Sequence, residues 1–194
     1  AASDVYKRQV FHTAAGREVR DGGGVSPDVE VKQERLPNIL YYLVRDNLIF
    51  DYATDFCLKH PVIASAEKFE LTDADYTDFK NKVKGADFKY DQQSEKILKT
   101  LKEAAEFEGY MKEASAEFKA LENKLTHNLD RDLDYFSKDI KEMIAEEIIK
   151  RYYYQRGAII QQLKGDNELD EAVKILTNPE RYQQILSVTA TEKK

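Results

Sequence analysis

Residues 132–164 read DLDYFSKDIKEMIAEEIIKRYYYQRGAIIQQLK, and this stretch decides the fold. Apolar side chains recur in it mostly at spacings of three and four, which is the period of one helix face. A helix of this length would span on the order of 50 Å. Gly157 interrupts the pattern, so we expect a kink or a close helix contact there. The apolar positions are Leu133, Phe136, Ile140, Met143, Ile144, Ile148, Tyr152, Ile159, Ile160 and Leu163.

Outward from this stretch, the same period predicts further helices. Pro37 suits a first helical turn, and the residue before Pro61 disfavours helix, so one helix is expected between them. Thr72 is a predicted N-cap, with Asp75 at the capping-box position. Helices are predicted at 37–60, 72–84, 92–110, 113–125, 132–164 and 169–176, and from Asn178-Pro179 onward.

The first 36 residues follow another pattern. Val10–Thr13 and Glu18–Arg20 are β-prone and flank a turn at residues 14–17, which predicts a hairpin. Val29 and Val31 alternate with charged residues, as in a half-buried strand. So few strands cannot bury themselves as a sheet, and they need partner strands from elsewhere. The fold class is therefore mainly α, with an N-terminal strand pair before a multi-helix domain that contains one long helix.

Composition excludes several function classes. The 194 residues carry a net charge of -6 without blocks of Lys and Arg, which argues against nucleic acid as a partner. One Cys and three scattered His give no disulfide framework and no zinc site. No window approaches 18 uninterrupted apolar residues, so no membrane span is expected. We expect no metal and no cofactor.

Two loops resemble ligand sites and miss the required residues. Asp21-Gly22-Gly23-Gly24 is not followed by the Lys-Ser or Lys-Thr of a phosphate-binding loop, so we interpret it as a structural turn. Residues 130–134 begin like a calcium loop, but Tyr135 stands where Gly is needed and Lys141 where Glu is needed. We interpret these acidic residues as part of a first helical turn, which the helix dipole favours.

No catalytic constellation is apparent. Cys57 lies on the apolar face of its helix, and His60 one turn away has no third group to orient it, so a buried, inert thiol is predicted. The stretch 151–156, RYYYQR, points its tyrosines about 100° apart on a helix, so they form no stacking platform for bases. The serines, at 3, 26, 65, 94, 115, 137 and 187, lack a nucleophile motif. Catalytic residues are therefore expected to be none.

Residues 11–31 read FHTAAGREVRDGGGVSPDVEV. They resemble the pattern F-x-T-x-x-G-R-x-V-x-x-G-G-G-(hydrophobic)-x-P-D-(hydrophobic)-x-V of carboxyl-terminal processing peptidases, also called tail-specific proteases. The helical remainder is more loosely similar to the C-terminal extension of members from Bacteroidetes-type bacteria, chiefly at residues 129–133 and 151–157.

The resemblance implies a serine peptidase that uses a Ser–Lys dyad beside a PDZ domain. In that family both dyad residues precede the motif, so no residue here inherits either role. It implies the C-terminal fragment of a hydrolase for proteins, working in the periplasm or cell envelope. Its partners would be protein or peptide substrates through the missing core, and a second copy or another protein through the helices.

We expect three segments. Residues 1–9 resemble translated sequencing-adaptor sequence and are interpreted as a non-native head. Residues 10–36 would be the C-terminal strands of the peptidase core, and residues 37–194 a helical C-terminal domain. The alternative, which the sequence leaves open, is a free-standing helical interaction module with no link to proteolysis.

Overall fold

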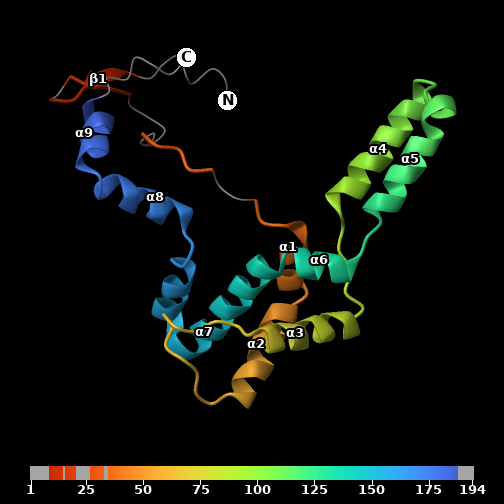
Figure 1. Cartoon of the computed structure of the whole chain (residues 1–194), viewed down its shortest axis with the longest axis horizontal. Coiled ribbons are helices and arrows are strands. Elements are labelled where there is room, and N and C mark those ends of the chain that lie inside the picture. Colours follow the sequence, from red (N-terminus) through yellow and green to blue (C-terminus); the bar gives the residue numbers. More distant parts are fainter. Residues whose placement is uncertain (1–8, 15, 21–26, 33–34, 188–194) are drawn as a thin grey trace. The chain divides into compact units, whose positions relative to one another are not determined.

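The computed structural model describes residues 9–14, 16–20, 27–32 and 35–187. In these residues it contains nine helices and one two-stranded antiparallel hairpin (Figure 1), which confirms the predicted fold class. The elements are β1 (Val10–His12), β2 (Glu18–Arg20), α1 (Asn38–Arg45), α2 (Leu48–Lys59), α3 (Asp73–Gly85), α4 (Gln93–Phe107), α5 (Met111–Leu125), α6 (Leu129–Tyr135), α7 (Ser137–Gln162), α8 (Asn167–Leu176) and α9 (Pro179–Ser187).

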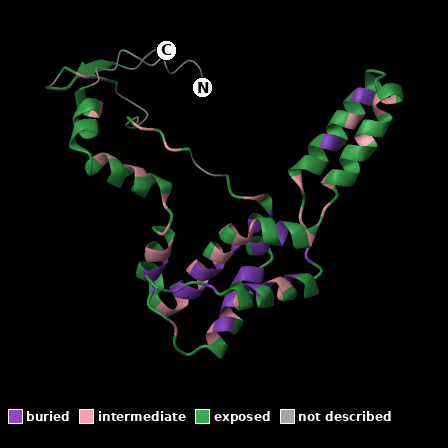
Figure 2. Ribbon diagram, viewed as in Figure 1, coloured by how far each residue is buried: buried purple, intermediate pink, exposed green. Residues whose placement is uncertain are grey.

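The chain divides into two compact units. One comprises residues 34–164, and the other comprises residues 1–33 together with 165–194. Buried residues lie along α1, α2, α3, α6 and α7 of the first unit (Figure 2), and these elements share one apolar core. In the second unit, no described residue is buried.

The core is centred on the contact between α2 and α7. Ile140, Ile144 and Ile148 of α7 are completely buried, as the spacing of four predicted. Phe136 and Tyr152 extend this stripe as half-buried residues packed against the core. Fully burying a side chain of this size contributes roughly 1.5–3 kcal/mol.

The start of α3 follows the predicted cap. Thr72 accepts a hydrogen bond from the Asp75 backbone N–H at 3.1 Å, and the Asp75 carboxylate accepts from the Thr72 backbone N–H at 3.1 Å. This is the predicted capping box, and α3 ends at Gly85. Asn128 and Asp166 cap α6 and α8 in the same way, through oxygens that accept from backbone N–H groups one turn ahead.

Three expectations on regular structure are wrong. The helix predicted from Pro37 to His60 is two helices, because Asn47 adopts the left-handed conformation (φ 59°), which Asn tolerates better than most residues. The helix predicted over residues 132–164 is interrupted at Phe136, where α6 ends and α7 begins. Residues 29–31 form no strand, since no described strand lies beside them to pair with.

The predicted irregularity near Gly157 is real, but its centre is Tyr154, with φ 57° and ψ −156° inside α7. The predicted close contact is found at Gly157 itself, where the helix leaves no room for a Cβ. A Cβ at this position would overlap the Cβ of Tyr153 and lie 2.8 Å from Ile149 Cγ2. Neither atom is the free end of a flexible side chain, so the helix must deform to accept one.

Gly157→Ala therefore has an effect opposite to the usual one. In an ordinary helix this change stabilises by up to about 1 kcal/mol, whereas here overpacking should destabilise by about 1–3 kcal/mol. Gly85→Ala is the matched control, because a Cβ at Gly85 meets nothing within 4 Å. Urea melts should move the two midpoints in opposite directions. If Gly157→Ala is as stable as Gly85→Ala, the bend in α7 is not as described.

Candidate interaction sites

The sequence motif forms the hairpin turn of β1 and β2. The strands pair antiparallel, with Phe11 opposite Val19. Across the turn, the Thr13 N–H donates to the Arg17 carbonyl at 2.9 Å, and the Arg17 N–H donates to Thr13 Oγ1 at 3.1 Å. Gly16 has φ +81°, a left-handed conformation that favours glycine. Thr, Gly and Arg of the motif therefore each have a local structural task.

Arg17 also joins the turn to the later part of the motif. Its guanidinium forms an ion pair with the Asp28 carboxylate through both terminal nitrogens, and the bond from Nη1 to Oδ2 is 3.2 Å long. A two-pronged Arg–carboxylate contact fixes geometry better than a single hydrogen bond. The Gly-Arg and Pro-Asp pairs are thus one unit, although the Gly-rich loop between them, residues 21–24, lies outside the described residues.

The hairpin leaves its apolar side chains in solvent. Val10, Phe11 and Val19 are 46%, 51% and 42% exposed. An isolated two-stranded hairpin is marginally stable in water, and it gains stability from further strands or from a covering helix. The hairpin is therefore a candidate surface for strand addition.

The predicted candidates in the helical unit have structural tasks. Asp130 and Asp132 lie in the first turn of α6, as predicted. Asp130 pairs with Lys84 and Asp134 pairs with Lys80, so these carboxylates face different lysines. In the described part of the chain, no group of three His, Cys, Asp or Glu is placed to hold a metal ion.

Asp132 is the feature that sequence reasoning missed. It is 3% exposed, the one buried charged residue among those described. Its carboxylate accepts hydrogen bonds from Tyr90 Oη at 2.5 Å and Gln92 Nε2 at 2.6 Å, and it pairs with Arg131 at 2.7 Å. Tyr90 in turn packs on the His127 ring, with the ring centres 4.4 Å apart. Because Gln92 precedes α4 and His127 follows α5, this cluster fixes the base of the α4–α5 hairpin.

The RYYYQR stretch binds the chain's own backbone. Arg151 donates to the Phe50 carbonyl at 3.0 Å and lies over the Phe50 ring. Tyr152 donates to the His60 carbonyl, and Tyr153 donates to the Ala64 carbonyl at 3.1 Å. Arg151 therefore holds α2, and Tyr152 and Tyr153 hold the segment that follows it, so these three side chains have partners within the chain.

The remaining candidates are dispersed. Cys57 was predicted to be buried and is only half-buried against the core. His60 stacks on Phe56, and its Nδ1 lies 2.9 Å from the Phe56 carbonyl. Ser137 is half-buried, and Ser3 and Ser26 lie outside the described residues. The other serines, at 65, 94, 115 and 187, are exposed. None of the described helices is both long and apolar enough to cross a membrane.

Comparison with known proteins gives a family. A family model described as "Probable PDZ-protease, C-terminal helical domain" matches residues 39–176, which is most of the chain, and the chain belongs to this family. The match falls on the helices, whereas the motif that resembles processing peptidases lies before them. No curated protein and no solved structure matches the chain.

Alkaline pH should weaken the core through its tyrosines. Burial raises the pKa of Tyr52, Tyr76 and Tyr90, and for Tyr90 the Asp132 carboxylate adds to the effect. Burial likewise raises the pKa of Tyr152 to about 12. An unfolded tyrosine titrates near pH 10, so the native state holds these protons more tightly. Stability from this source is complete below about pH 10 and is lost as pH rises towards 12.

Urea melts at about pH 8 and pH 11 would measure the loss, and absorbance near 295 nm would report tyrosinate. Tyr90→Phe should reduce the difference between the two pH values, because it removes one of these phenols. An unfolding free energy that stays constant from pH 8 to pH 11.5 would contradict the assignment.

Proposed function

We propose that this chain is the C-terminal helical part of a serine peptidase that hydrolyses peptide bonds in proteins. Its Ser–Lys dyad would lie outside these residues, so the chain alone should have no peptidase activity. Two lines support the proposal: the family match of the helices, and the motif of residues 11–31 that resembles processing peptidases. The same resemblance is the basis for inferring a location in the periplasm or cell envelope.

The observation that carries the proposal is how the motif of residues 11–31 is bonded and how far its apolar side chains are exposed. Its turn is held by Arg17 and Asp28, yet the strands beside that turn expose Val10 and Phe11 to solvent. A segment with fixed polar bonds and uncovered apolar side chains fits one that completes another sheet. We infer that β1 or β2 adds to the sheet of the peptidase core, by main-chain hydrogen bonds along its free edge.

In this arrangement the helical unit follows the catalytic core. Its own stable core, centred on α2 and α7, would let it hold a fixed surface beside the active site. That surface would position protein substrates, join protomers or bind a partner.

Complementation in two pieces tests the proposal. A processing-peptidase core that retains its Ser–Lys dyad but lacks its own C-terminal strands should be inactive on unfolded casein. Adding this chain should restore peptide release. Arg17→Gln should weaken the restoration by up to about fivefold, because the surface ion pair with Asp28 that it removes contributes at most about 1 kcal/mol.

Arg35→Gln is the matched control, because Arg35 is exposed and lies outside the motif. Peptide release by this chain alone, abolished by replacing one of its serines, would refute the proposal. A chain that neither binds the core nor restores activity would favour the alternative, a free-standing helical interaction module.

A further inference from the structure

The α4–α5 hairpin has one closed side and one open side. On the closed side, Lys102 of α4 pairs with Glu122 of α5 at 2.6 Å. Between the helices, Leu98 and Ala105 are buried and Phe118 is half-buried. No residue of α4 or α5 belongs to the apolar core shared by α1, α2, α3, α6 and α7. The apolar side chains of this hairpin therefore have to find their own partners.

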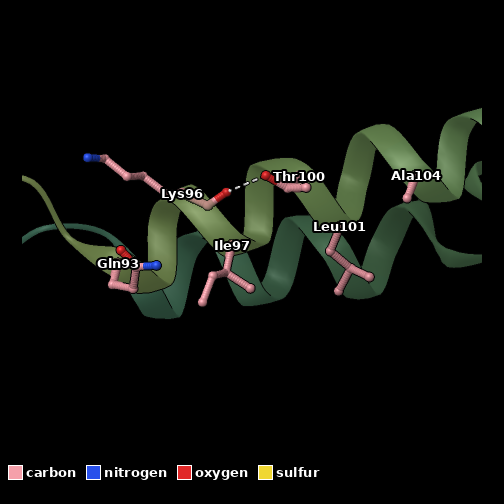
Figure 3. Close-up of a pocket in the computed structure, with 6 residues that line it drawn as sticks. All are labelled: Gln93, Lys96, Ile97, Thr100, Leu101 and Ala104. Carbon is pink, nitrogen blue, oxygen red and sulfur yellow. Dashed lines mark hydrogen bonds between the residues drawn. The ribbon is translucent and has the colours of Figure 1, made fainter. Parts of the chain in front are cut away.

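The open side is apolar and exposed. Ile97 and Leu101 of α4 are 57% and 52% exposed, and Leu121 of α5 is 41% exposed. Figure 3 shows Ile97 and Leu101 projecting from the same side of α4. They lie in a shallow groove of about 430 Å³ lined by Gln93, Lys96, Ile97, Thr100, Leu101 and Ala104. Two helices with an apolar open side form half of a four-helix arrangement.

Charges beside this open side are arranged in two pairs. On α4, Lys96 and Glu103 are seven residues apart, so they point in nearly the same direction, about two turns from each other. On α5, Glu117 and Lys124 have the same spacing and again opposite charges. All four side chains are exposed. Lys96 also pairs with Asp91 at 2.6 Å, so a contact with a second copy would be shared with that carboxylate.

This pattern is self-complementary under one two-fold axis. If α4 packs antiparallel on α4 of a second copy, Lys96 meets Glu103 of that copy, and the reverse contact forms by symmetry. The same axis brings Glu117 to Lys124 of the second copy. The Glu95 carboxylate accepts from the His127 N–H at 3.1 Å, and Lys102 pairs with Glu122 at 2.6 Å. These two contacts place the midpoints of the two charge pairs within about one turn of the same level.

The same charges disfavour the other two-fold arrangement, in which the two hairpins point in the same direction. That arrangement would place α4 on α5 of the second copy, so that Lys96 approaches Lys124 and Glu103 approaches Glu117. Like charges in register repel, and such repulsion selects between otherwise similar packings. The charges thus favour one relative direction for two copies of this hairpin.

We propose that the open side of the α4–α5 hairpin is a docking surface for a second copy of this chain, packed antiparallel into a four-helix bundle. The apolar part of this surface consists of only three exposed large side chains, Ile97, Leu101 and Leu121. We therefore expect a weak dimer, with a dissociation constant on the order of 100 µM.

Sedimentation equilibrium of the 194-residue chain, from about 10 µM to about 1 mM, tests this docking. Glu103→Lys brings like charges together twice in each dimer and should raise the dissociation constant about tenfold. Adding Lys96→Glu to Glu103→Lys restores opposite charges across the axis, so the double variant should return to within about threefold of the unchanged chain. Leu101→Glu should abolish the dimer, because it places a carboxylate in the groove.

The matched control is Lys99→Glu with Glu106→Lys, which makes the same charge changes on the side of α4 that faces away from the groove. It should leave the dimer unchanged. A chain that stays monomeric at 1 mM would overturn the proposal and leave the groove to a different partner. So would a dimer that Glu103→Lys does not weaken, or one that the double variant fails to restore.

Discussion

The burial of one face of α7 against α2 is the constraint on which residues 34–164 depend. Ile140, Ile144 and Ile148 lose all contact with solvent, and α1, α3 and α6 add their apolar side chains to the same core. The later half of α7 and Lys164, which follows it, then hold the segment after α2 through side chains that donate to its carbonyl groups. Gln161 Nε2 donates to the Ala66 carbonyl at 2.8 Å, and Lys164 donates to the Phe69 carbonyl at 3.0 Å.

The motif segment is held by a different kind of interaction. Its turn rests on backbone hydrogen bonds and on the ion pair between Arg17 and Asp28, with no buried apolar side chain among its described residues. Ion pairs at the surface contribute at most about 1 kcal/mol. These interactions set the local shape of the motif without providing a core. The helical unit has its own core, whereas the motif is arranged to join another one.

Sequence reasoning was accurate where a pattern is local or periodic. The spacing of four in α7, the cap at Thr72 and the β-prone run with its turn after Phe11 each follow from short-range rules. The breaks at Asn47 and Phe136 were missed because the apolar spacing continues through both, so the pattern does not show where the backbone leaves the helical conformation. Asp132 was missed as a buried carboxylate because its partners Tyr90 and Gln92 are about 40 residues away in sequence.

The central claim is that the helical unit has its own core and that the described part of the motif of residues 11–31 has none. Amide hydrogen exchange on the chain alone tests this claim most directly. The account predicts strong protection from Ile140 to Ile149, which are packed in the core, and fast exchange in Val10–His12 and Glu18–Arg20, whose apolar side chains are uncovered. The protein concentration should be low, so that association does not add protection. Equal protection of the hairpin and of α7 in monomeric chain would mean that the motif has a core of its own, and would contradict the account.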